Sequence, residues 1–285
     1  MPPRAYDLHA PTGPTTPVVF ASPHSGRHYD AAFLARSVLT PQQLRSSEDA
    51  FVDRIFGAAP DHGAPLLAAH LPRAWLDVNR SAEELDSALI EGLRRGIHNP
   101  RVASGLGVVP RVVSGGRAIY RGKIPAEEAQ ARIRDVWQPY HATLARLLRE
   151  SGDRFGHAIL VDCHSMPHEA LQGLPQASRP DVVLGDRYGA AAATGIVDRI
   201  EAAFAEAGFT VSRNAPFAGA YTARQYGRPA EGRHVVQVEI DRALYMDEAS
   251  VTPHAGFAAL KERIDRVVAR ICDEARSAGV SLAAE

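Results

Sequence analysis

Short apolar segments alternate with longer amphipathic segments along most of the chain. The short segments are rich in β-branched residues, which is typical of buried strands, and they lie at residues 17–22, 66–71, 74–78, 158–163, 182–184 and 234–240. In the longer segments apolar residues recur at helical spacing, which predicts helices at residues 42–59, 125–150, 189–207 and 255–278. Strands separated by helices predict an α/β fold, with a mixed, mainly parallel sheet sandwiched between helices.

The composition is typical of a globular protein with a full core. Apolar residues make up 45% of the 285 residues and charged residues 23%. A chain of this length suits one large α/β domain. We therefore expect a single domain over residues 1–285, in which the Pro- and Thr-rich residues 1–16 are loosely ordered.

Charge and cysteine usage exclude several classes of partner. The formal net charge is −1, so there is no basic field of the kind that binds nucleic acid or an anionic membrane. No apolar run approaches the roughly eighteen residues that span a bilayer. Cys163 and Cys272 are far apart and form no Cys-x-x-Cys pair, which favours a reducing compartment over a disulfide framework. We expect a cytoplasmic protein.

Polar residues follow the predicted strands at three places. His24 follows the first strand, residues 77–80 follow another, and His164 comes at the end of a third. Ligands of open α/β sheets gather beyond the carboxyl ends of the strands. Residues 100–123 form a long Gly-, Pro- and Arg-rich loop, and a loop of this length inside a compact domain is more often functional than idle.

Two of these polar residues are candidate zinc ligands. Hydrolytic zinc sites use three imidazole or carboxylate ligands and a water. His24 (PHSG) and His164 (DCHSMP) can supply two of them, and Asp49 in SSEDAF, or its neighbour Glu48, the third. Asp162 points to the same side of its strand as His164 and can orient that imidazole. The alternative is structural, because the chain has 12 histidines and a histidine after a strand is often only hydrogen-bonded.

Several arginines offer binding sites for a carboxylate. Asn79 and Arg80 (DVNR) pair an amide with a guanidinium, whose planar fork matches a carboxylate. Arg121 lies in the glycine-rich segment GGRAIYRG and Arg224 in PFAGAYTARQYG. The alternatives are a strand-end turn for the first pair and mobile surface loops for the other two.

Glu239 is the most informative single carboxylate. It lies within the apolar strand VVQVEID, where an unpaired charge is costly. Such a residue is either paired structurally or kept for catalysis.

The motifs PHSG, SSEDAFVDRIF, DVNRSAEELD, GGRAIYRG, LVDCHSMP, PFAGAYTARQYG and VVQVEIDRALYMDE, in this order, resemble the N-formylglutamate amidohydrolase family over about residues 17 to 250. That family is related more distantly to zinc carboxypeptidases and aspartoacylases. Their shared order is a metal histidine, an Asn-Arg carboxylate reader, a second metal histidine and a late catalytic glutamate. It maps onto His24, Asn79-Arg80, His164 and Glu239. One departure is Arg27, where the carboxypeptidase pattern has its metal carboxylate, so Asp49 is the expected acidic ligand.

The resemblance implies a zinc-carboxypeptidase-like fold and one Zn²⁺ per chain. The implied reaction is hydrolysis of N-formyl-L-glutamate to formate and L-glutamate, a late step of histidine breakdown. Glu239 would move the proton, and Arg121 is the candidate to stabilise the oxyanion. Asn79 and Arg80 would hold one carboxylate of the small dianionic N-acyl amino acid, and Arg224 the other.

Two rival functions stay open at this point. A related N-acyl-amino-acid amidohydrolase or a small zinc carboxypeptidase would use the same site with another pocket. A carboxylate-binding protein without enzymatic activity would keep the arginines but need neither the two histidines nor the glutamate. The sequence leaves the oligomeric state open.

Overall fold

The computed structural model describes residues 4–13, 15–94 and 99–282, and it is built around a seven-stranded sheet of order β1-β3-β2-β6-β9-β7-β8. The four inner strands β3, β2, β6 and β9 are parallel. The outer strand β1 is antiparallel to β3, while β7 is antiparallel to β9 and parallel to β8. The sheet strands are β1 Tyr6–His9, β2 Val18–Ser22, β3 Leu66–Ala69, β6 Ala158–Met166, β7 Val182–Gly185, β8 Val211–Arg213 and β9 Arg233–Asp241.

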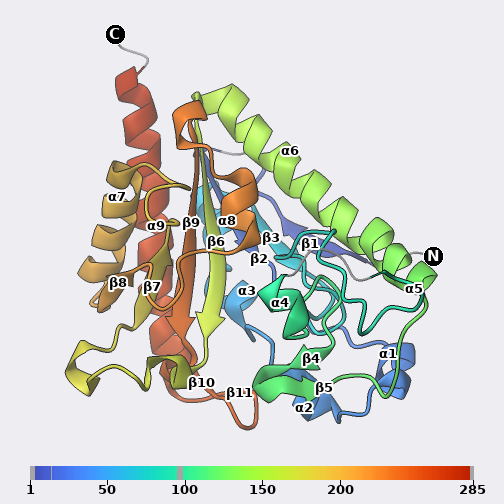
Figure 1. The fold of residues 1–285 in the computed structure, drawn as a ribbon. Coiled ribbons are helices and arrows are strands. Elements are labelled where there is room, and N and C mark those ends of the chain that lie inside the picture. Colours follow the sequence, from blue (N-terminus) through green and yellow to red (C-terminus); the bar gives the residue numbers. More distant parts are fainter. Residues whose placement is uncertain (1–3, 14, 95–98, 283–285) are drawn as a thin grey trace.

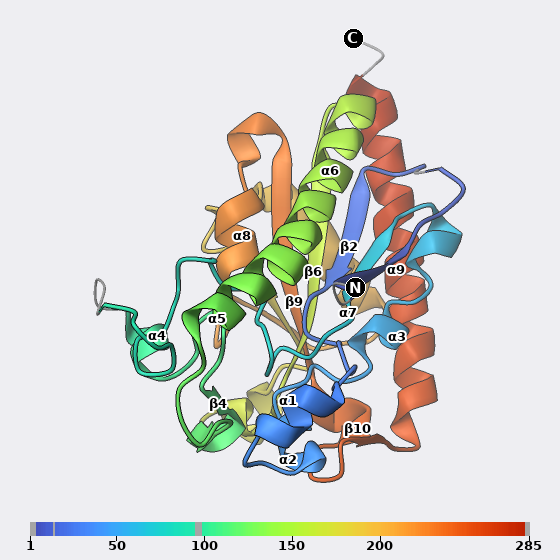
Figure 2. The same ribbon diagram turned by 90° about the vertical axis from the view of Figure 1, so that its right-hand side faces the viewer.

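Helices cover both faces of this sheet (Figures 1 and 2). Successive side chains of β2 alternate between two cores, with Val18 and Phe20 in one and Val19 and Ala21 in the other. The first core contains α3 (Val52–Ile55), α7 (Thr194–Glu206) and α9 (Gly256–Leu282); the second contains α5 (Ala126–Arg132), the π-helical turn Ile133–Trp137 and α6 (Gln138–Phe155). This confirms the predicted mixed, mainly parallel α/β sheet between helices.

Short elements gather at one end of the sheet. The arrowheads of β6 and β9 point toward the end of the molecule where α1, α2 and the two small hairpins lie (Figure 1). The carboxyl ends of the inner strands, and the polar residues that follow them, therefore face this end. The short elements at this end are α1 Ala31–Arg36, α2 Pro41–Arg45, α4 Pro100–Ala103, β4 Val112–Val113, β5 Arg117–Ala118, β10 Met246–Asp247 and β11 Thr252–Pro253. Another short helix, α8 Tyr221–Tyr226, lies beside β9, away from this end (Figure 1).

The prediction of one helix over residues 42–59 is wrong, because the chain forms α2, a turn and α3 there. The backbone N–H of Asp49 donates to the carbonyl of His24 at 3.0 Å, outside any helix. Phe51 has φ 68°, in the left-handed region that interrupts a helix. The break turns Asp49 toward the sheet.

The strand predicted at residues 74–78 is also wrong. The backbone N–H groups of Trp75 and Leu76 donate to Pro72 O at 2.9 and 3.3 Å, and that of Asp77 donates to Val108 O at 2.8 Å. The segment is a series of turns, so its apolar residues pack in the core without joining the sheet.

Other boundaries shift by a few residues. The helix predicted at 125–150 continues through Gly152 and ends at Phe155, where Gly156 adopts φ 78°. The helix predicted at 189–207 begins only at Thr194. Within the expected loose segment 1–16, residues 6–9 form β1, while residues 1–3 and 14 lie outside the described residues. Among the helices in the described ranges, none is long and apolar enough to cross a membrane.

Candidate active site

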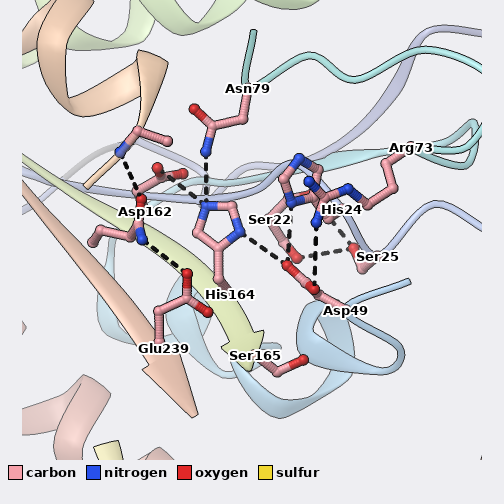
Figure 3. A network of polar contacts seen from close by, with 12 residues as sticks. Ser22, His24, Ser25, Asp49, Arg73, Asn79, Asp162, His164, Ser165 and Glu239 are labelled. Carbon is pink, nitrogen blue, oxygen red and sulfur yellow. Dashed lines mark hydrogen bonds and ion pairs between the residues drawn. The ribbon is translucent and has the colours of Figure 1, made fainter. Parts of the chain in front are cut away.

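Three predicted ligands converge at the carboxyl ends of the inner strands. Asp49 Oδ2 lies 3.2 Å from His24 Nδ1 and 2.9 Å from His164 Nδ1. One ligand atom from each residue lies within 4.8 Å of the other two, and all three side chains are buried. Figure 3 shows the two imidazoles next to the Asp49 carboxylate. Two imidazoles and a carboxylate are a common ligand set of catalytic zinc sites. This group can hold a metal ion.

The fold brings these ligands together from three segments. His24 follows β2, His164 is on the adjacent strand β6, and Asp49 comes from the turn before α3. On β6, residues 158 and 160 pack in the core under α6 while 159 and 161 face α9. Alternation therefore directs His164 to the α6 face, along with Asp162.

The outer nitrogens of both histidines face carboxylates. His24 Nε2 lies 2.7 Å from Asp77 Oδ1, and His164 Nε2 lies 3.2 Å from Asp162 Oδ2. Metal-ligating histidines are commonly oriented by a carboxylate in this way, with the other ring nitrogen left for the metal. Asp162 is fully buried, and neither of its oxygens has a hydrogen bond of good geometry within the described ranges. The arrangement fits a metal site in which Nδ1 of both rings, which faces Asp49 Oδ2, would bind the ion.

The electrostatics keep the acidic groups ionised. Burial alone would raise the pKa of Asp49, but its hydrogen bonds with His164 and His24 hold that pKa well below its usual range. Burial likewise opposes ionisation of Asp77, yet His24 and Arg73 hold its pKa well below the usual range. Charged carboxylates are the form that binds a divalent cation.

Glu239 lies beside this group on the next strand. In the parallel pair β6–β9, His164 is the register partner of Glu239. Burial raises the pKa of Glu239 to about 7, with the charge of His164 opposing that shift. Gln237 Nε2 donates to Glu239 Oε1 at 2.8 Å, and Gln237 Oε1 accepts from Ala220 N at 3.0 Å. The backbone contact fixes which end of the Gln237 amide faces the glutamate.

Asn79 reaches the same site, while Arg80 is bonded to the backbone. Asn79 Oδ1 accepts hydrogen bonds from the Thr222 N–H at 2.8 Å and hydroxyl at 2.9 Å, and its Nδ2 lies 3.2 Å from His164 Nε2. Arg80 is buried, and its Nε and Nη1 donate to Leu106 O at 3.1 Å and Asn79 O at 2.8 Å.

Three other candidates lie apart from this network. Glu48, the alternative acidic ligand, accepts hydrogen bonds from Tyr29 and Arg45 and does not belong to the group of His24, Asp49 and His164. Arg121 is exposed, and no hydrogen bond or ion pair among the described residues joins it to the site. Arg224 is exposed on α8, with its guanidinium over the Tyr221 ring at 5.7 Å.

Two arginines of the site escaped sequence analysis. Arg73 Nη2 donates to Asp77 Oδ2 at 2.8 Å, and its Nη1 lies 4.0 Å from Asp49 Oδ1. Arg242 Nη2 donates to Asp49 Oδ1 at 2.8 Å. Arg242 directly follows the charged end of the strand VVQVEID, which is a signal that the sequence did carry. Arg73 has no comparable signal, since it lies in the short gap between the two segments predicted as strands, residues 66–71 and 74–78.

A buried group of two histidines and one carboxylate, next to a buried glutamate at the carboxyl ends of parallel strands, is the residue set of a metal-dependent hydrolase built on an α/β sheet. The family model of N-formylglutamate amidohydrolase matches residues 16–246 of the chain. The chain belongs to this family, as the ordered motifs indicated.

The sequence is similar to individual relatives over most of the chain. N-formylglutamate deformylase of Pseudomonas aeruginosa is 32% identical over 260 residues, covering 90% of this chain and 91% of the relative. That of Pseudomonas putida is 30% identical over 235 residues, covering 81% of this chain and 82% of the relative.

Solved structures agree as well. The crystal structure of N-formylglutamate amidohydrolase from Ralstonia eutropha superimposes with a TM-score of 0.90 at 36% identity, covering 96% of this chain and 99% of that one. A gene product of Agrobacterium tumefaciens, at 15% identity and a TM-score of 0.64 over 98% of this chain and 95% of its own, shares the fold.

Proposed function

We propose that this protein is a zinc-dependent amidohydrolase that cleaves N-formyl-L-glutamate to formate and L-glutamate. It would act as a single hydrolase domain with one Zn²⁺ held by His24, Asp49 and His164. The observation that carries the proposal is the buried His-Asp-His group one strand away from Glu239. The names of the Pseudomonas relatives support the substrate.

The ligand set fits zinc by its donor chemistry and by its surroundings. Each histidine has a carboxylate at its outer nitrogen, which fixes the ring, so that Nδ1 would be the atom that holds the ion. A zinc ion there would lower the pKa of a water from 15.7 to roughly 7 and polarise the formyl oxygen.

Glu239 is the proposed proton carrier. Gln237 occupies its Oε1, so Oε2 is the oxygen that takes the proton of the attacking water and returns it to the leaving nitrogen. Its pKa of about 7, which burial raises, suits a group that must accept and release a proton near neutral pH.

The oxyanion that forms at the formyl carbon needs a positive partner. Arg121 is the candidate from the sequence, and it stays a prediction. Arg73 is the better-placed guanidinium, because it already lies beside Asp49 and Asp77. We propose that Arg73 takes this role.

The substrate carboxylates would be read by Asn79 and Arg80 on one side and Arg224 on the other. Asn79 Nδ2 lies 3.2 Å from Nε2 of His164, a proposed metal ligand. Arg224 borders a groove together with Tyr221 and Arg187. A dianionic substrate would need two separate contacts of this kind, one for each carboxylate.

The decisive experiment is formate release from N-formylglutamate by zinc-loaded protein. Activity should disappear after treatment with a chelator and return with added zinc, and elemental analysis should give one zinc per chain. N-formylglutamine, which lacks the distal carboxylate, is the matched control substrate and should react more slowly. Activity that survives complete removal of the metal would refute the zinc mechanism. Faster turnover of N-acetyl amino acids or peptides would favour a related acylase or a carboxypeptidase.

The setting of this reaction follows from the same proposal. Hydrolysis of N-formylglutamate would complete a late step of histidine breakdown. Both cysteines are free and buried, which is consistent with the proposed cytoplasmic location. Thiols oxidised to a disulfide in protein isolated from cells would contradict that location.

A further inference from the structure

Arg242 is a buried arginine in direct contact with a proposed metal ligand. It begins the short 3-10 helix Arg242–Leu244, directly after β9, the strand that carries Glu239. Its Nη2 donates to Asp49 Oδ1 at 2.8 Å and to Ser165 O at 3.3 Å, and its Nε donates to Ser165 Oγ at 3.2 Å. The guanidinium therefore joins Asp49 to the residue that follows His164.

The two oxygens of Asp49 face different partners. Oδ2 faces the Nδ1 atoms of His24 and His164, at 3.2 and 2.9 Å. Oδ1 faces Arg242 at 2.8 Å, with Arg73 at 4.0 Å. A carboxylate held in this way has one oxygen for a metal and the other committed to a guanidinium.

We propose that Arg242 is a positioning residue that holds Asp49 as a one-oxygen metal ligand and thereby sets the metal affinity and coordination number of the site. This inference rests on the proposed function, because it takes His24, Asp49 and His164 as the metal ligands. Arg242 itself touches neither metal nor substrate.

The shape of the guanidinium explains why an arginine is used here. Nε and Nη2 lie on one edge of the rigid fork, and together they span Asp49 and Ser165. A lysine offers one nitrogen and can keep the bond to Asp49 or those to Ser165. Nη1 adds a weaker ion pair with Glu248 at 3.7 Å.

Coulomb's law alone predicts the opposite effect, which makes the proposal testable. A positive charge next to a cation site repels the cation, so a mutant without that charge would bind metal more tightly. If Arg242 instead acts by orienting Asp49, its loss weakens binding, because residues that orient metal ligands typically contribute about 10–100-fold in metal affinity. The direction of the change separates the two roles.

The test compares Arg242→Gln, Arg242→Lys and wild type as full-length proteins. The dissociation constant for Zn²⁺ is measured by competition with a chromogenic chelator, and the coordination of Co²⁺ is followed by visible absorption. We expect Arg242→Gln to bind Zn²⁺ about 10–100-fold more weakly. Its Co²⁺ bands should also weaken, because the released Oδ1 of Asp49 raises the coordination number. Arg242→Lys keeps one donor for Asp49 and should be intermediate.

Arg263→Gln is the matched control. Arg263 is partly buried, donates to Ala207 O at 2.9 Å and covers the Phe209 ring at 3.6 Å, away from the site. Its loss should lower the melting temperature without changing metal affinity.

The outcomes separate this inference from the proposed function. A wild type that binds no zinc refutes both. A wild type that binds zinc, with equal or tighter binding and an unchanged Co²⁺ spectrum in Arg242→Gln, refutes only the role of Arg242. If Arg242→Gln does not fold, Arg242→Lys decides alone, and zinc binding within twofold of wild type overturns the proposal.

Discussion

Two guanidinium groups compete for one catalytic role, and single substitutions separate them. Arg73 contacts two carboxylates of the site, whereas Arg121 is exposed and joined to none of the described site residues. We expect Arg73→Met to lower kcat for formate release by about 10²–10³-fold, the usual effect of removing an oxyanion donor. Arg121→Met should leave kcat nearly unchanged.

Zinc content must be measured in both arginine variants, because Arg73 also supports the Asp77 carboxylate that faces His24. If Arg121→Met loses activity with its zinc retained while Arg73→Met stays active, Arg121 and not Arg73 stabilises the oxyanion.

Glu239→Gln tests the proposed proton carrier. The glutamine keeps the volume of Glu239, and its amide oxygen can still accept from Gln237 Nε2, a bond of 2.8 Å in the wild type. It cannot take a proton from the attacking water. We expect kcat to fall by about 10²–10⁴-fold, the usual contribution of general acid–base catalysis.

Zinc content and melting temperature should change little in Glu239→Gln, because Glu239 is not a proposed ligand. Loss of zinc, or residual activity that follows only the folded fraction, would make Glu239 structural. Near-normal kcat with zinc bound would require another base.

At the scale of elements, the long helix α5–α6 supports the loop that carries Asn79. The π-helical turn at residues 133–137 brings Trp137, whose Nε1 donates to Arg80 O at 2.8 Å. One turn further on, His141 Nε2 lies 2.8 Å from Val78 O, and its Nδ1 lies 2.8 Å from the Tyr226 hydroxyl of α8. The neutral imidazole satisfies both contacts, donating to the carbonyl and accepting from the hydroxyl.

This contact predicts an acid-sensitive stability. Burial lowers the pKa of His141 from 6.5 to about 4, so between these values the unfolded chain binds a proton that the folded chain does not. Stability therefore falls as the pH falls through this window. Lowering the pH from about 7 to about 5 should cost about 2 kcal/mol through this residue.

The measurement is urea unfolding at these two pH values, with a chelator present so that metal binding does not contribute. His141→Gln keeps a donor for Val78 O but does not titrate, and it should lose less stability than wild type over the same range. An equal loss in both proteins would show that the pH dependence comes from other groups.

At the scale of the whole molecule, the sheet assembles a site from residues far apart in the chain. His24 follows β2, His164 lies on β6 and Glu239 lies on β9, and these three strands are adjacent in the sheet. Asp49 contacts His164 although the two residues are 115 positions apart in the sequence. Asp49 reaches the site from a turn that precedes β3 in the sequence, and Asp77 from a turn that follows β3. Figure 3 shows how His24, Asp49, His164 and Glu239 lie relative to one another at the ends of the strands.

The sequence by itself determined the layers of the fold and the chemical types in the site. Continuous apolar runs are typical of strands in a sheet covered on both faces, and the fold confirms this at β2, β6 and β9, although not at residues 74–78. The ordered motifs indicated the family. His24, Asp49 and His164 were predicted as a group, and the structure brings them together.

Only the tertiary structure decided which residues surround that group. Local pattern cannot show that the Asp49 N–H bonds to His24 O, and this contact breaks the helix predicted at residues 42–59. Nor does it show that Arg73 and Arg242 reach Asp49, whereas Arg121 stays exposed. The physical reason is that strand propensity and helical periodicity depend only on residues that are close together in the sequence. The partners of a buried charge are fixed by how separate segments pack, and packing is a property of the whole sheet.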